Sequence, residues 1–395
     1  MSLHFFPLTY LEEGDEVVVG RMDTDSYGVF PPDGATLLRE LANGRPPAEA
    51  AEWYAQRYGE LVDIEEFLDT VRGLGFVADE ATSDAGGAAD PASPQVCWQR
   101  LGRALFSPLA WACYVTLVAA AATVCVANPR LLPVPRHIFF SEYLLVIEVT
   151  LFLAQLPLGL LHETFHALAG RRLGLNASIG VSRRLYFVVF ETALDGLVIV
   201  PRRQRYLPML AGMLADVLTL CLFTLIAWLM LRPDGSLPLG GRLCLALAFT
   251  SVPGIATQFY FFLRTDLYYL ITTVLGCVDL HTTAKALLHN WFRALCGRRD
   301  GLVDASRWHP RDAAVARWYA PLYVVGYVAM LAMLLVMLPV TWRFFHTAIR
   351  TVLDAATPPA RFWDAAVLLA LNVFQLGLAG YIAVRDRRRA RIRPS

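Results

Sequence analysis

His162 and His166 lie four positions apart, with Glu163 between them, in the segment His-Glu-Thr-Phe-His. On a helix, residues at i and i+4 share one face, so the two imidazoles could provide two of the ligands of a tetrahedral zinc ion. Glu163 points about 100° around such a helix, where its carboxylate could act as a general base on a water at the metal. The segment therefore predicts a site for one Zn²⁺ with hydrolytic chemistry.

The two histidines also have other interpretations. A histidine pair on an apolar helix can be a satisfied pair in a protein core, or a contact to haem or quinone. The preceding residues 144–161, LLVIEVTLFLAQLPLGLL, predict a membrane span. Two imidazoles and a carboxylate at membrane depth are costly unless they have a function, so this context favours metal binding.

The elements that must position these side chains are predicted to be membrane helices. The chain is 56% hydrophobic with a mean hydropathy of +0.45, which is above the usual range of soluble proteins. A span needs ~20 apolar residues. We place about six spans near 104–127, 142–169, 206–231, 243–263, 318–340 and 364–384. The predicted fold is a mainly α polytopic helical bundle.

The distribution of basic residues predicts the orientation of these spans. The segments 171–205, 264–317 and 385–395 contain 7, 8 and 6 Lys or Arg residues, whereas 128–141, 232–242 and 341–363 contain 2, 2 and 3. Because cytosolic segments are enriched in these residues, the first three are expected to be cytosolic, as are both termini. We expect a multi-pass protein of the cell membrane, and we interpret the basic C-terminal tail as a topological anchor, with no nucleic-acid partner.

Zinc needs at least one further protein ligand and an open position for water. The second and fourth spans are predicted to run in the same direction, so their C-terminal ends lie at the same depth. His162 and His166 end the second span, and Asp266, in FFLRTDLYYL, follows the apolar run of the fourth. We therefore expect Asp266 to be the third ligand.

Several other acidic residues compete with Asp266 for a role at the site. Asp216 lies inside the third span, where it could accept a hydrogen bond from a ligand histidine or pair with another group. Glu191 and Asp195 lie in the inner segment RLYFVVFETALDG, which is typical of short strands and a turn. Glu142 and Glu148 lie toward the outer half of the second span, where polar contacts within the bundle are expected.

Residues 1–80 differ in charge from the rest of the chain. They include 17 acidic and 5 basic residues, whereas the remainder has 17 acidic and 30 basic ones. We expect a small cytosolic α+β module with strands at 16–21 and 26–31 and helices at 33–43, 47–58 and 63–74. No cleavable signal peptide is evident, and the polar residues 81–96 predict a flexible linker. Seven scattered cysteines without a C-x-x-C pair argue against disulfides and a cysteine zinc site.

The segment HETFHALAGRRLG resembles the first motif of the site-2 protease family of intramembrane zinc metalloproteases. In that family a later Asp, usually followed by Gly, completes the zinc site, and the matching position here is Asp266 in TDLYYL, with Leu267 in place of the glycine. The segment TDLYYL is similar to the corresponding segment in the peptide zinc metalloprotease branch of the family. The segments FETALDG and LAGMLAD are also similar to segments of that branch. The resemblance covers roughly 140–280 and implies an endopeptidase.

The N-terminal region resembles a PqqD-like domain, a winged-helix-like module that recognises leader peptides of modified peptides. The similarity lies in VVVGRMDTDSYGVFPPDGATLLRELANG and VDIEEFLDTVRGLGFV. Such domains pair an extended peptide with a sheet edge. The alternative is a folding module without a ligand.

Together these features predict a membrane zinc endopeptidase that hydrolyses a membrane-associated or leader-bearing peptide. The resemblance further implies a role in maturation of, or immunity to, a bacteriocin-like peptide. The rival hypothesis is a non-proteolytic membrane partner that binds or exports a precursor through the N-terminal module. A transporter is less favoured because the sequence shows no ATP-binding motif and no repeated half.

Overall fold

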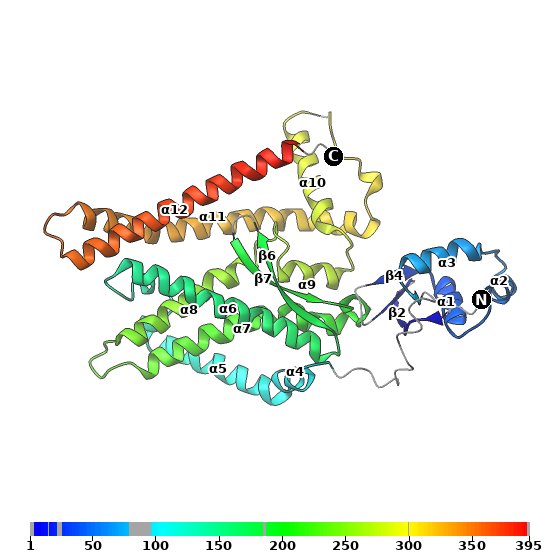
Figure 1. Cartoon of the computed structure of the whole chain (residues 1–395), viewed down its shortest axis with the longest axis horizontal. Coiled ribbons are helices and arrows are strands. Elements are labelled where there is room, and N and C mark those ends of the chain that lie inside the picture. Colours follow the sequence, from blue (N-terminus) through cyan, green and yellow to red (C-terminus); the bar gives the residue numbers. More distant parts are fainter. Residues whose placement is uncertain are drawn as a thin grey trace. The chain divides into compact units, whose positions relative to one another are not determined.

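The computed structural model describes residues 4–14, 16–21, 26–78, 96–184, 187–298 and 300–392 (Figure 1). Helices predominate, and six of those in the described ranges are long and apolar enough to cross a membrane. They are Pro108–Ala127 (α5), Leu144–Arg172 (α6), Arg202–Leu229 (α7), Leu239–Thr257 (α8), Pro310–Leu353 (α11) and Pro359–Ile392 (α12). The predicted helical class and number of spans are confirmed for these residues.

By its internal contacts the chain divides into two compact units. One comprises Met1–Phe106, His166–Gly180 and Thr192–Pro208, and the other comprises Ser107–Phe165, Val181–Glu191 and Met209–Ser395.

The first unit contains the expected α+β module. Its strands are His4–Phe5 (β1), Thr9–Glu13 (β2), Glu16–Gly20 (β3), Tyr27–Phe30 (β4) and Val77–Ala78 (β5), and its helices are Pro32–Ala42 (α1), Pro47–Tyr58 (α2) and Ile64–Gly73 (α3). Strands β2, β3 and β4 form an antiparallel sheet in this order, and β1 pairs with β5. Val17 and Val19 of β3 pack with Leu38 of α1 and Val71 of α3 in a buried core. The expected turn at 22–25 and most of the expected linker lie outside the described residues.

Local signals explain why the module's helices begin and end where they do. Helix α2 has Pro47 at its first position and Gly59 after its end, with a φ of 76° that only glycine adopts without strain. Helix α3 is capped by Asp63, whose side chain accepts hydrogen bonds from the N–H groups of Glu65 and Glu66. The strands β1, β2 and β5 were not predicted from the sequence.

Two predicted spans are interrupted inside their predicted bounds, whereas α11 and α12 extend beyond the predicted 318–340 and 364–384. The predicted span 104–127 is divided, because Ser107 caps a new helix whose first residue is Pro108, so Gln99–Leu105 forms a separate helix, α4. The predicted span 243–263 ends as a helix at Thr257, and turns follow. Asp266 therefore does not end this span but begins a further helix, Asp266–Leu275 (α9), which Leu280–Leu295 (α10) follows.

The N-terminal end of α6 is bonded to α12, which runs back along α11 (Figure 1). The Asp364 carboxylate accepts hydrogen bonds from the N–H groups of Leu144 (2.7 Å) and Leu145 (3.2 Å), which would otherwise lack acceptors at the helix start. Deeper in the bundle, Asn372 donates to Glu148 at 2.8 Å. The polar contact expected for Glu148 is confirmed, and Glu142 pairs with Arg361.

Between α6 and α7, the strands Ala177–Arg184 (β6) and Phe187–Leu194 (β7) form a two-stranded sheet. The strands expected in this inner segment are therefore observed. They precede a short 3-10 helix, Leu197–Ile199 (η4).

Candidate metal centre

Both histidines of the motif lie on α6, which stays helical from 144 to 172 although it contains Pro157. The continuous helix places His162 and His166 one turn apart on the same face. His166 is buried, with 7% of its surface exposed, and His162 and Glu163 are partly buried. The helix therefore presents two imidazoles at a site that is largely shielded from solvent.

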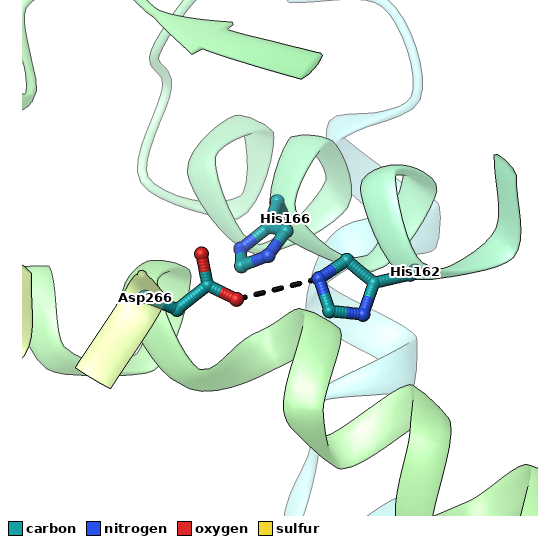
Figure 2. A group of neighbouring side chains, drawn as sticks. All are labelled: His162, His166 and Asp266. Atoms are coloured by element: carbon teal, nitrogen blue, oxygen red, sulfur yellow. Dashed lines mark ion pairs between the residues drawn. The ribbon is translucent and has the colours of Figure 1, made fainter. Parts of the chain in front are cut away.

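Asp266 lies beside these histidines. Its Oδ2 is 3.3 Å from Nε2 of His162. One ligand atom from each of His162, His166 and Asp266 can be chosen so that all three lie within 4.8 Å of one another (Figure 2). Asp266 is the first residue of α9, where the positive end of the helix dipole stabilises a carboxylate.

The second ring nitrogen of each histidine has its own partner. Nδ1 of His162 lies 3.0 Å from Oδ2 of Asp216, and Nδ1 of His166 lies 2.6 Å from the carbonyl oxygen of Pro208. Metal-binding histidines commonly donate this second N–H to a carboxylate or a backbone carbonyl, which fixes the tautomer and the orientation of the ring. If Nδ1 donates in both rings, Nε2 of each ring is left as the atom that can bind a metal.

A short turn after α8 positions Asp266. The side-chain oxygen of Gln258 accepts the N–H of Asp266 at 3.1 Å, and the Thr265 hydroxyl donates to the carbonyl of Gln258 at 3.0 Å. These two hydrogen bonds fix the backbone immediately before α9. The side-chain amide of Gln258 thereby fixes the backbone position from which the Asp266 side chain extends.

The turn after α8 also lies against α11. The Tyr319 hydroxyl donates to the carbonyl oxygen of Phe261 at 2.8 Å. Gly326 faces the same stretch, where a Cβ would lie 2.7 Å from the backbone nitrogen of Phe261. The helix can approach this closely only because residue 326 has no side chain.

The other acidic candidates occupy different positions. Asp216 lies beside His162, in the position of the hydrogen-bond acceptor that was considered for it from the sequence. Glu191 is exposed on β7, and Asp195 lies in the following turn, where its N–H donates to the carbonyl of Asn176 at 3.1 Å. Neither belongs to the cluster, and no other His, Cys, Asp or Glu in the described ranges forms a further cluster of this kind.

Three positions that build the site were not predicted from the sequence. They are the acceptor carbonyl of Pro208, the amide of Gln258 and the close approach at Gly326. No local pattern marks them, because each acts through a contact between segments distant in sequence.

Comparison of the chain with models of known protein families, with curated proteins and with solved structures finds no match.

Proposed function

We propose that this chain is a membrane-embedded endopeptidase that uses one zinc ion held by His162, His166 and Asp266. The observation that carries the proposal is the arrangement of the two imidazoles, each with its Nδ1 beside an acceptor and both close to the same carboxylate. Two imidazole nitrogens and one carboxylate oxygen are a donor set that suits zinc, and three protein ligands leave a fourth position for water or substrate. Catalytic zinc sites have this composition, whereas structural sites are closed by four protein ligands.

The residues of the chain have separate roles in the proposed reaction. Glu163 takes a proton from the attacking water and delivers it to the leaving amine. Asp216 keeps His162 in the tautomer whose Nε2 can bind the metal, and Pro208 does the same for His166. Zinc, when bound, would lower the pKa of a water molecule and polarise the scissile carbonyl.

The proposed substrate is a membrane-associated or leader-bearing peptide, with both termini of the enzyme in the cytosol of the producing cell. Hydrolysis needs an extended backbone, and the strands β6 and β7 offer strand edges to which such a segment could pair. Membership of the site-2 protease family and a role in maturation of, or immunity to, a bacteriocin-like peptide remain predictions from the sequence resemblance.

For the N-terminal module we propose recognition of the peptide. Its two sheet edges differ: Glu13, at the end of β2, binds Arg202 and Arg205, whereas Tyr27 and Val29 of β4 are 41% and 54% exposed. The edge of β4 is therefore the better candidate for pairing with an extended peptide. The winged-helix-like and PqqD-like character of the module remains a prediction.

Two measurements test the enzymatic proposal. The first is the zinc content of the purified wild-type protein beside His162→Ala; we expect one zinc per chain in the wild type and a loss in the variant. The second is mass spectrometry of new peptide N-termini in membranes from cells that express either the wild type or Glu163→Gln. We expect termini that depend on Glu163, although the Glu163→Gln protein keeps its zinc.

The rival function makes a different prediction for the second measurement. If wild type and Glu163→Gln both hold zinc and produce the same set of N-termini, the endopeptidase proposal is wrong and a non-proteolytic partner is favoured. If the wild type holds no zinc, the metal site itself is refuted.

A further inference from the structure

Five arginines lie where α6 ends and α7 begins, and they fall into two groups. Three of them have protein acceptors: Arg171 donates to the carbonyl of Ala177 at 2.7 Å, and Arg202 and Arg205 both bind the carboxylate of Glu13. The other two are Arg172 and Arg203. Within the part of the chain that the structure describes, their side chains have no ion pair and no hydrogen bond.

These two arginines line the same cavity. It has a volume of about 390 Å³ and is lined by Arg172, Leu173, Arg203, Gln204 and Leu207. Two guanidinium groups and an amide provide hydrogen-bond donors for an anion, and the two leucines provide an apolar wall. A ligand that matches this lining has an anionic group joined to an apolar part.

We propose that this cavity binds the headgroup phosphate of an anionic phospholipid. The cavity lies at the ends of two helices that are long and apolar enough to cross a membrane, on the side that the basic residues predict to be cytosolic. Lipid phosphates lie at this level of a bilayer, and basic pockets between spans on the cytosolic side bind anionic headgroups. Guanidinium groups suit phosphate because their planar donors can form two parallel hydrogen bonds to it.

The bound lipid would join two elements that build the metal centre. Arg172 follows His166 by six residues on α6, and Leu207 precedes Pro208, the acceptor of His166, on α7. A lipid held between the two helices would stabilise their spacing. The site does not depend on peptidase activity, since it rests only on the lining of the cavity.

The test uses the full-length protein purified in detergent and analysed by native mass spectrometry. The probes are dioctanoyl phosphatidylglycerol and, as the neutral lipid, dioctanoyl phosphatidylcholine. We expect the wild type to retain the anionic lipid at least about tenfold more tightly, and each of Arg172→Gln and Arg203→Gln to weaken its retention about fivefold. Arg298→Gln, which removes an exposed arginine outside the cavity, serves as the matched control and should bind like the wild type.

Further measurements keep the test decisive. Arg203→Lys keeps the charge but loses the paired donors of the guanidinium, so its lipid retention should lie between that of the wild type and that of Arg203→Gln. Thermal unfolding of each variant verifies that it is folded. Inorganic phosphate at millimolar concentration should not displace the lipid; displacement by it would favour a free phosphate and overturn the proposal. Equal retention of the two lipids by the wild type, or an unchanged preference in the double variant Arg172→Gln/Arg203→Gln, would also overturn it. If the cavity instead receives an acidic side chain of a peptide, the wild type should retain the two lipids equally.

Discussion

Gly326 on α11 offers a test of how Asp266, the proposed third ligand, is positioned, although Gly326 lies far from the histidines in the sequence. In Gly326→Ala, the new Cβ would lie 2.7 Å from the nitrogen of Phe261 and 3.2 Å from the carbonyl carbon of Tyr260. Ordinary contacts between such atoms are ~3.5–4.0 Å, so the turn and the helix must separate by about 0.8 Å or more. The neighbouring atoms are backbone, which cannot rotate away as a flexible side chain would.

This displacement is large for a metal site. Overpacking of this kind costs about 1–3 kcal/mol, of which the better helix propensity of alanine offsets up to about 1 kcal/mol. Metal–ligand distances are held to within about 0.2 Å, so a shift that carries Asp266 with the turn takes its carboxylate out of reach. We expect zinc affinity to fall by about 10–100-fold, the range seen when the support of a metal ligand is removed.

The assay is a competition titration of zinc against a chromophoric chelator on the purified protein. Gly377→Ala is the matched control, since it makes the same change in a membrane-spanning helix where no atom lies within 4 Å of the new Cβ. It should bind zinc like the wild type. The variant Asp266→Ala gives the reference value for the zinc affinity of the site without its proposed third ligand.

A double variant separates this mechanism from general destabilisation. If Gly326 acts through Asp266, then Gly326→Ala should cause little further loss of zinc affinity in the Asp266→Ala background, because the two changes remove the same ligand. Full additivity, or wild-type affinity in a folded Gly326→Ala protein, would refute the reasoning.

Three other substitutions test the polar contacts of the chain. Asp216→Asn should weaken zinc binding about 10–100-fold by removing the carboxylate acceptor of the first histidine, whereas Glu148→Gln, which also removes an intramembrane carboxylate, should leave the zinc titration unchanged. Asp364→Ala leaves two N–H groups at the start of α6 without their acceptor, and thermal unfolding should show a loss of about 1–3 kcal/mol; an unchanged melting temperature would contradict the capping role. In the module, a hydrogen bond from the Tyr54 hydroxyl lowers the pKa of the Asp33 carboxyl. This bond therefore stabilises the folded module above the unfolded-state pKa of Asp33, and the stabilisation is lost as the pH falls through the folded-state pKa. Hydrogen-exchange protection of α1 and α2 should therefore be weaker in Tyr54→Phe at pH 7 and converge with that of the wild type in acid; a difference independent of pH would exclude this origin.

Features encoded by neighbouring residues could be predicted from the sequence. The i, i+4 spacing of the two histidines is sufficient to place them on one face, because α6 is continuous through them. Helix α2 has the expected bounds, 47–58, and begins at Pro47 as predicted. Ser107 and Pro108 form a helix start signal of the same kind, which the hydropathy of 104–127 concealed.

Features that depend on contacts between distant segments could not be predicted. The apolar residues 259–263 continue the hydropathy of the fourth span, but the helix ends at Thr257 because the following turn is held by Gln258 and by α11. Asp266 was expected beside the histidines as the end of the fourth span, but in the structure it begins a separate helix. The acceptor carbonyl of Pro208 was not predicted, whereas Asp216 was considered as an acceptor for a histidine, and the contact between α7 and α6 makes it the partner of His162.

The charges of the cluster favour the proposed cation site over a satisfied histidine pair. Asp216 and Asp266 approach the same imidazole ring, one at Nδ1 and the other at Nε2 of His162. A buried imidazole needs only one acceptor for its single N–H, and even an imidazolium offers one positive charge to two carboxylates, which are costly in a low-dielectric bundle. One divalent cation offsets both carboxylates and leaves the two imidazoles neutral, which is the form in which they bind metals. A core pair explains why His162 has one partner, whereas a cation explains why a second carboxylate lies beside the same ring.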